Sequence, residues 1–159
     1  MTTLPAAQRV AEAARVLGLE IEVREFPEGT RTAEDAARAI GVTVGQIVKS
    51  LVFLADGEPV VCLVSGVNRL DQAKLATAAG ASRIERADAD AVREATGFAV
   101  GGVPPFGHPR PLPVYCDDDL LTYDVAWAAA GTPSAVFSVD PKRLAEVTGA
   151  RVVDLKEDA

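Results

Sequence analysis

Apolar residues fill two neighbouring stretches in the middle of the chain. VKSLVFLA, from Val48 to Ala55, and PVVCLVS, from Pro59 to Ser65, are rich in β-branched residues and have the length of strands. Asp56-Gly57 lies between them and favours the tight turn of a β-hairpin. Further strands are expected from Ile21 to Phe26, where apolar and charged residues alternate, and from Leu112 to Cys116, Val125 to Ala129, Ser134 to Val139 and Arg151 to Leu155.

Helix signals separate these strands. A Thr or Asp before a helix accepts hydrogen bonds from its first amides, and a Gly after it adopts left-handed backbone. Thr32 precedes Ala33-Glu34-Asp35 and Gly41 follows, so a helix is expected between them. The same rule predicts helices from Thr3, with Pro5 in the first turn, to Leu17, from Asp71 to Ala79, from Asp88 or Asp90 to Thr96, and from Asp140-Pro141 to Gly149, with a capping box at Thr43 and Gln46.

The order of these elements predicts the fold class. Helices and strands intermix, but the hairpin interrupts a strict βαβ alternation. We therefore expect an α+β fold, a mixed sheet flanked by helices, rather than a Rossmann arrangement. The chain has 159 residues and no evident linker, so one domain spanning residues 1–159 is expected.

Composition narrows the expected cellular location of the protein. Hydrophobic residues make up 48% of the chain, and no run approaches the ~20 apolar residues that span a bilayer. Arg9, Glu12 and Arg15 interrupt the apolar stretch that an N-terminal signal peptide would need. We expect a cytoplasmic protein with no membrane partner.

The net charge of −7 limits the possible partners. From residue 111 to 159 there are nine acidic and four basic residues, so this last third carries most of the excess. A protein that coats nucleic acid neutralises many phosphates and needs the opposite balance. Local binding of one nucleic-acid end remains compatible with the charge.

Candidate metal ligands are sparse. Cys62 and Cys116 lie in apolar strand-like runs, which favours small buried side chains, and His108 is the single histidine. Asp117, Asp118 and Asp119 are consecutive and would point in different directions, so Asp117 or Asp118 is expected to cap the turn through Leu121. We predict no metal and no cofactor.

Two features have competing interpretations. Lys49 lies inside an apolar strand, where its ammonium either reaches solvent or points into a pocket. The stretch FAVGGVPPFGHPRPLP, from Phe98 to Pro113, is either a surface crossover stiffened by prolines or a loop whose glycine amides bind an anion or carbonyl. It is not a nucleotide-triphosphate loop, because His108-Pro109 stands where Lys-Ser/Thr would be. His108 is expected to be solvated, and Gly131 makes either a tight bend or a close approach to a ligand.

Taken together, these segments resemble one family. VKSLVF, RLDQAKLA, GFAVGGVPPFG, AAGTP and SVDPKRLAEVTGARVVDL occur in the order found in the YbaK/EbsC aminoacyl-tRNA deacylases, which are related to the editing domain inserted in bacterial prolyl-tRNA synthetases. The resemblance covers about residues 26–155. It implies a strongly curved sheet and hydrolysis of the ester between a wrong amino acid and the terminal adenosine of a tRNA.

The resemblance also implies site residues. Lys49 matches the essential lysine, and a catalytic role is expected for it and for the amides of Gly101 and Gly102. Attack would come from a positioned water or from the substrate's own groups. Substrate-binding roles are implied for Phe26, Arg31, Ser50, Pro105, Gly107 and Gly131.

Two positions leave the specificity open. A histidine is common in the family where Arg31 stands, and the residue after the lysine, here Ser50, varies. Cysteinyl, alanyl, seryl and threonyl esters are all compatible with the resemblance. The expected partner is the tRNA acceptor end, with Arg31, Arg69 and Lys74 as candidate phosphate contacts and a synthetase or elongation factor as a further partner. The alternative is a non-catalytic module that binds an aminoacyl group, a nucleotide or a protein in the same pocket.

Overall fold

The computed structural model describes residues 5–26 and 32–158. The helices are α1 (Ala6–Val16), α2 (Ala33–Ile40), α3 (Gln72–Ala79), α4 (Ala89–Thr96) and α5 (Pro141–Thr148), with 3-10 turns η1 (Val44–Gln46) and η2 (Asp118–Thr122). The strands are β1 (Arg24–Glu25), β2 (Val48–Ala55), β3 (Glu58–Ser65), β4 (Ile84–Arg86), β5 (Val114–Asp117), β6 (Ala126–Ala129), β7 (Ala135–Val139) and β8 (Arg151–Val153).

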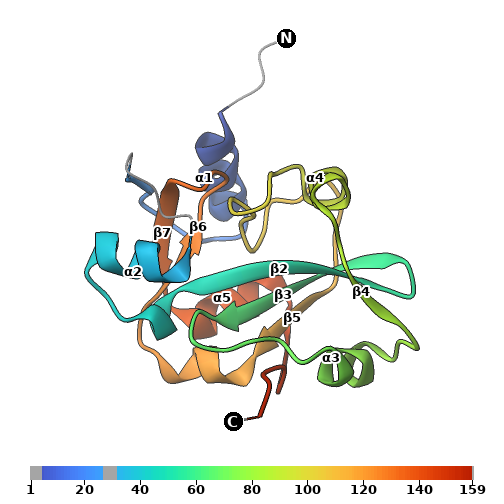
Figure 1. Cartoon of the computed structure of the whole chain (residues 1–159). Helices are drawn as coiled ribbons and strands as arrows, with labels where there is room; N and C mark the ends of the chain where they lie inside the picture. The colour runs from blue at the N-terminus through green and yellow to red at the C-terminus, as the bar shows by residue number, and fades with distance from the viewer. Residues whose placement is uncertain (1–4, 27–31, 159) are drawn as a thin grey trace.

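The strands form two sheets that meet at one corner. A five-stranded mixed sheet has the order β4-β2-β3-β5-β8, and a three-stranded antiparallel sheet has the order β1-β7-β6. A single parallel bridge between Ile47 and Trp127 joins them. Figure 1 shows β2 and β3 crossing the molecule, with β6 and β7 rising from one end and α2 beside that corner. The predicted α+β class with a mixed sheet flanked by helices is confirmed.

The hairpin and most helix ends follow the sequence signals. Asp56 and Gly57 have φ of 49° and 84°, as the two central residues of a tight hairpin turn require. Thr32 caps α2 by accepting a hydrogen bond from the Asp35 amide at 3.0 Å. Side-chain caps at Asp71, Asp88 and Asp140, the capping box at Thr43, and left-handed glycines after α2, α3, α4 and α5 are likewise confirmed.

Several boundaries differ from the sequence-based expectation. Pro5 is the residue before α1 rather than part of its first turn, while Thr3 lies outside the described residues. The strand expected from Ile21 to Phe26 is reduced to β1, because only Arg24 and Glu25 pair with β7. Strand β4 was not predicted, since three residues are too few to show alternation. It pairs with only the last three residues of β2, which leaves the first half of β2 as a sheet edge.

Two apolar cores lie on opposite faces of the larger sheet. One face, with Phe53, Cys62 and Tyr115, packs against Leu75 of α3. The other face packs toward α1, α4, α5 and the smaller sheet, and Phe137 lies in the middle of this core. The ring of Phe106 packs against Phe137 with centroids 5.6 Å apart. Val103 to Phe106 are therefore buried, and the interpretation of the glycine-proline stretch as a surface crossover is wrong for this part of it.

Candidate active site

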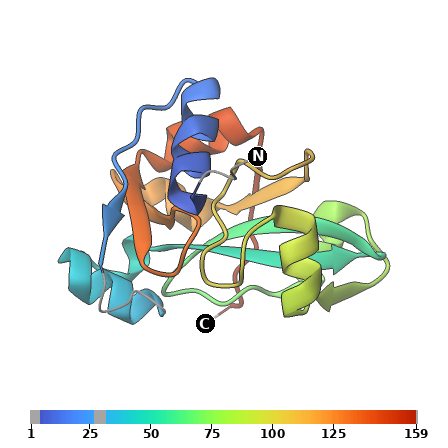
Figure 2. The same cartoon turned by 90° about the horizontal axis from the view of Figure 1, so that it is seen from above.

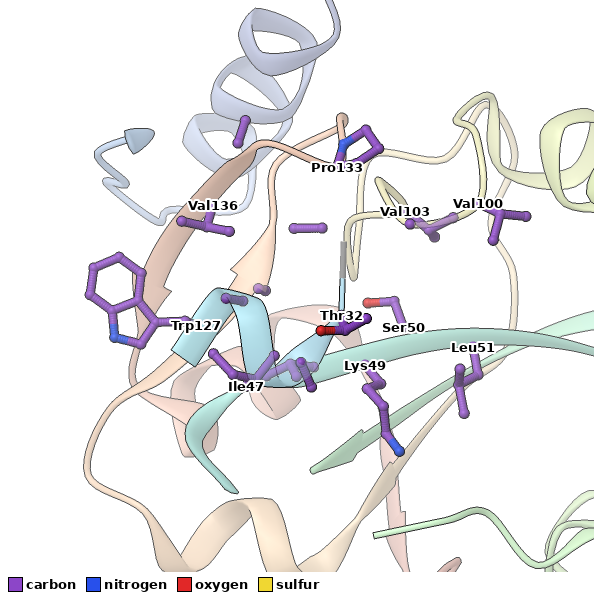
Figure 3. Close-up of a pocket in the computed structure, with 17 residues that line it drawn as sticks. Thr32, Ile47, Lys49, Ser50, Leu51, Val100, Val103, Trp127, Pro133 and Val136 are labelled. Atoms are coloured by element: carbon purple, nitrogen blue, oxygen red, sulfur yellow. The ribbon is translucent and has the colours of Figure 1, made fainter. Parts of the chain in front are cut away.

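A pocket of about 300 Å³ opens at the corner where the two sheets meet. The first half of β2 forms its floor, and the start of α2, the loop after α4, β6 and β7 form its walls (Figure 3). The lining is largely apolar: Ala33, Ala36, Ile47, Val48, Leu51, Val100, Val103, Trp127, Ala128, Ala129, Pro133, Ala135 and Val136, with Thr32, Lys49, Ser50 and Gly101. A small apolar cavity with a few polar groups is the usual form of a small-ligand site.

Lys49 and Ser50 leave opposite faces of β2, because side chains alternate along a strand. Figure 3 shows the Ser50 hydroxyl on the side of Val103 and Pro133 and the Lys49 ammonium on the other side. The Ser50 Oγ atom is buried and has no hydrogen-bond partner within the described chain. A buried hydroxyl without a partner is costly, so it marks a place where a ligand atom would be stabilised.

The Lys49 ammonium donates a hydrogen bond to the backbone carbonyl oxygen of Asn68. Partial burial lowers the pKa of Lys49 below its ordinary value, and this is the largest influence. The carboxylate of Glu34 opposes the shift, whereas the guanidinium groups of Arg69 and Arg86 add to it. The positive group is thus available from the α3-facing side of the sheet.

A second, more polar groove adjoins the pocket. It has a volume of about 690 Å³ and is bounded by Lys49, Leu51 and Phe53 of β2, by Arg86 of β4 and by the start of α3. Lys49 and Leu51 line both spaces, since they sit on the exposed edge of β2. The charged residues of the groove are Lys49, Arg69, Asp71, Arg86 and Glu157.

The two candidate catalytic glycines have different surroundings. Gly101 lines the pocket, and its amide donates no hydrogen bond to the described chain. The Gly102 amide instead donates to the carbonyl oxygen of Ala99 at 3.0 Å, so it is not a free donor. A Cβ atom on Gly102 would lie 2.8 Å from the Gly131 oxygen and 2.7 Å from Thr132 Cα, so glycine is needed here for backbone packing.

Three other predicted site residues lie behind the pocket and do not line it. Gly131 has φ of 99°, and a Cβ there would come within 2.9 Å of the Ala6 backbone. Gly107 meets Ala13 of α1 in a similar way, with a distance of 3.0 Å, and Pro105 is buried. Figure 2 shows α1 over the β6–β7 turn and beside the loop that follows α4. Gly107 thus lets the loop come close to α1, and Gly131 does the same for the β6–β7 turn.

The predicted entrance residues are only partly described. Phe26 is half-buried, and its amide donates to the Ser134 oxygen at 2.8 Å. The guanidinium of Arg24 lies 5.6 Å from the Phe26 ring and 5.4 Å from the Trp127 ring, so Phe26 sits beside a pocket residue without lining the pocket itself. Arg31 lies outside the described residues.

The sequence suggested a solvated His108, but its side chain is partly buried and forms a hydrogen bond within the loop. Its Nε2 atom lies 3.0 Å from the Pro104 carbonyl oxygen, so this nitrogen carries the proton and donates. Burial lowers the pKa of His108, and the hydrogen bond to Pro104 opposes that shift. His108 therefore closes the loop on itself.

Asp117 is the residue before η2, as one of the two expected capping residues, but its side chain makes no capping hydrogen bond there. It is fully buried, and its Oδ1 atom accepts a hydrogen bond from the Leu155 amide at 2.8 Å. The neighbouring carboxylates come close enough to hold a cation, yet the Lys156 ammonium already lies among them, 2.8 Å from Asp118 and 3.5 Å from Asp119. This lysine supplies a positive charge to the acidic cluster from within the chain, while the buried Oδ2 atom of Asp117 has no hydrogen-bond partner among the described residues.

Sequence reasoning missed three residues that the fold brings to the site. Trp127 lines the pocket, Asn68 supplies the acceptor for Lys49, and Arg86 lines the groove. The single tryptophan in a short strand was a usable signal for a pocket wall. Asn68 carried no signal of this kind, because its backbone carbonyl and not its side chain binds Lys49. Arg86 carried none, because it belongs to β4, a strand that was not predicted.

Comparison with known proteins identifies the family. A model of the aminoacyl-tRNA editing domain matches residues 27–147. The chain belongs to this family. No helix in residues 5–26 or 32–158 has the length and apolar character needed to cross a membrane.

The relatives agree with this assignment. The chain is 30% identical over 151 residues to EbsC of Enterococcus faecalis, a protein named as a candidate Cys-tRNA(Pro)/Cys-tRNA(Cys) deacylase, with 89% of this chain and 92% of that one covered. It is 38% identical over 101 residues to the proline–tRNA ligase of Maridesulfovibrio salexigens, covering 64% of this chain and 17% of the ligase. A crystal structure described as a candidate trans-editing enzyme for prolyl-tRNA synthetase matches with a TM-score of 0.92 and 51% identity over 99% of this chain and all of the other.

Proposed function

We propose that this protein hydrolyses the ester of mischarged aminoacyl-tRNA as a free-standing editing enzyme. The observation that carries the proposal is the pair of adjoining spaces at Lys49 and Leu51, one small and apolar and the other polar and cationic. An aminoacyl-tRNA end has the matching composition, because a small side chain and an ester are joined to a ribose and its phosphates. The family membership and the names of EbsC and of the trans-editing structure support the same activity.

The pocket suits a small amino-acid side chain. Its volume of about 300 Å³ is at the lower end of the range of small-ligand sites. Trp127 and Val136 wall it on one side and Val103 on the other, so bulky side chains would meet packed core. We expect cysteinyl, alanyl, seryl or threonyl esters as substrates.

Three groups of the pocket have distinct roles in this proposal. The free amide of Gly101 donates to the ester carbonyl oxygen, where negative charge develops as the bond breaks. The Ser50 hydroxyl, which has no hydrogen-bond partner among the described residues, accepts a hydrogen bond from the substrate's amino group. Lys49 binds a phosphate or ribose oxygen at the mouth and adds positive potential near the ester.

The reaction needs no strong nucleophile, because the ester of an aminoacyl-tRNA is already activated. The oxygen of a positioned water adds to the carbonyl carbon, and the bond from that carbon to the ribose oxygen then breaks. One proton of the water passes to the leaving ribose oxygen and the other stays with the new carboxyl group, so the products are the free amino acid and the uncharged tRNA. One preorganised donor to the oxyanion is worth on the order of 3 kcal/mol, or ~10²-fold or more in rate.

No Asp, Glu or His lines the described pocket, and this scheme uses no side-chain base. The adjacent ribose hydroxyl or a cysteinyl thiol of the substrate can assist the attack instead. Binding of only the acceptor end agrees with the net charge of −7. We expect weak, salt-sensitive affinity for tRNA, raised by a synthetase or elongation-factor partner.

A deacylation panel tests this function. tRNA charged separately with Cys, Ala, Ser, Thr and Pro is incubated with the wild-type protein and with Lys49→Ala, and loss of the charged species is followed over time. We expect hydrolysis of at least one small-residue ester and a decrease of 10²-fold or more in Lys49→Ala. Lys142→Ala, which removes an exposed lysine of α5, serves as the control and should retain full activity. Absence of hydrolysis for every ester would favour the non-catalytic binding module.

A further inference from the structure

Three cations that have no carboxylate partner within residues 5–26 and 32–158 converge beside the apolar pocket. Lys49 comes from β2, Arg69 from the loop after β3, and Arg86 from the end of β4, and all three line the same groove. None of them forms an ion pair with the described chain. Other cations nearby already form ion pairs: Lys74 pairs with Asp154 and Asp158, and Arg83 pairs with Glu85.

The carboxylates around this groove leave it positive. Asp71 accepts hydrogen bonds from the amides of Ala73 and Lys74 at the start of α3, and Glu157 is exposed near the C-terminus. Glu34 attracts the Lys49 ammonium from α2, but no ion pair forms between them. The groove contains three cations and two carboxylates and is therefore locally positive, although the chain as a whole has a net charge of −7.

The cations also repel one another. Both guanidinium groups disfavour the charged form of Lys49, in addition to its partial burial. Clustered cations of this kind are relieved by a polyanionic ligand, and arginine in particular matches the oxygens of a phosphate. The shared wall of Lys49 and Leu51 leads from the apolar pocket directly into the groove.

We infer that the groove of Lys49, Arg69 and Arg86 binds the phosphodiester backbone of the RNA strand that leads away from the aminoacylated ribose. This inference rests on the proposed function and extends it to the strand next to the ester. Lys49 takes the phosphate nearest the pocket, and the two arginines take those further along the strand. Of the earlier phosphate candidates, Arg69 fits this path, Lys74 does not because its ammonium is already paired, and Arg31 lies outside the described residues.

The test measures binding without hydrolysis. An uncharged, fluorescently labelled RNA hairpin that ends in single-stranded CCA is titrated with wild-type protein, Arg69→Glu, Arg86→Glu and the double variant over a series of salt concentrations. We expect each single variant to weaken binding about tenfold. The slope of log Kd against log salt should fall by about 0.7 for each phosphate contact removed.

Arg93→Glu is the matched control, because Arg93 is an exposed arginine of α4 outside the groove. It makes the same change of net charge, and its Kd should stay within about twofold of wild type. Equal weakening by Arg93→Glu and Arg69→Glu would show a general charge effect and overturn the inference. Unchanged binding in both groove variants would also overturn it. All three arginines are exposed, and matching denaturation midpoints will confirm that the variants are folded.

Two further arms identify the source of the phosphate. Inorganic phosphate and AMP are added as competitors of the labelled RNA. Competition only at concentrations well above the RNA Kd supports a strand site, whereas competition by free phosphate at a similar concentration overturns it in favour of a small-anion site. The outcome of this test is separable from the proposed function. If the wild type is active in the deacylation panel and the groove variants bind RNA normally, only the inference about the groove is refuted. An inactive wild type whose groove variants lose RNA binding refutes only the hydrolysis.

Discussion

The Lys49 ammonium is held by the backbone carbonyl oxygen of Asn68 and not by a carboxylate. A carbonyl fixes the position of the ammonium but leaves its charge uncompensated, so the charge remains available to a ligand. The stem of Lys49 shares the pocket with Gly101, but its charged end lies on the groove side of β2.

The C-terminal segment supports this contact. The Asn68 side-chain amide donates to Asp119 at 2.8 Å, and Lys156 lies 3.5 Å from the other oxygen of Asp119. The Glu157 amide donates to the Arg69 carbonyl oxygen at 2.7 Å, so residues 68–70 are held from both sides. The position of Lys49 thus depends on residues that follow the last strand.

Lys156→Met tests the dependence on this segment. Removal of the ammonium leaves the buried Asp117 without its nearest cation, which lies 3.6 Å away, and we expect a loss on the order of 3 kcal/mol in the free energy of unfolding. We also expect lower deacylase activity, because the loop that carries Asn68 is no longer held. Chemical denaturation and the deacylation assay measure the two effects, and Lys142→Met is the matched control. Wild-type values for both properties would contradict the prediction.

The same variant has a predicted pH dependence. Burial raises the pKa of Asp117 above 3.8, and the Leu155 amide and Lys156 oppose the rise. Without Lys156 the folded-state pKa rises further. The folded state then loses stability as the pH increases from 3.8 to the folded-state pKa of Asp117, because Asp117 of the unfolded chain releases its proton at the lower pH. The stability deficit of Lys156→Met should therefore be larger at pH 7 than at about pH 4. A deficit that is the same at both pH values would show that the ion pair is not its source.

Ser50→Ala should separate stability from activity. The variant removes a buried hydroxyl that has no hydrogen-bond partner in the described part of the chain, so we expect the free energy of unfolding to stay the same or to rise by up to about 1 kcal/mol. Activity should fall about tenfold or more, because the substrate loses a hydrogen bond. Ser65→Ala is the matched comparison: Ser65 is fully buried and donates to the Gly45 carbonyl at 2.7 Å, so its loss should cost about 1–2 kcal/mol. Equal destabilisation by the two variants would argue that Ser50 has a structural role.

The two cysteines should be inert in the folded protein. Burial raises the pKa of Cys62 and of Cys116 to about 12, so the reactive thiolate is scarce at neutral pH. We expect neither thiol to react with iodoacetamide at about pH 8 unless denaturant is present. Because the unfolded thiols ionise near 9.0, these groups make the folded state lose stability as the pH rises from there toward 12. Modification of either cysteine in the native protein at the rate of free cysteine would contradict the burial.

Local signals in the sequence were sufficient for most of the secondary structure. The Asp56-Gly57 turn, the capping residue Thr32 and the left-handed Gly41 act through the backbone of their neighbours, so the order of residues alone specifies them. The same holds for the strand VKSLVFLA, whose bounds agree with β2. Strand β4 escaped prediction because its pairing with β2 joins residues 29 to 33 positions apart in the chain.

What the tertiary structure alone decided is the surroundings of each candidate site residue within that framework. The sequence by itself determined that Lys49, Ser50 and the glycine loop would be present and that Lys49 and Ser50 would alternate along β2. Only the fold shows that Ser50 faces the apolar pocket, that Lys49 reaches Asn68 and a groove with Arg69 and Arg86, and that Gly102 and Gly131 serve backbone packing. These relationships join residues far apart in sequence, and they depend on the edge that β2 presents where the two sheets meet.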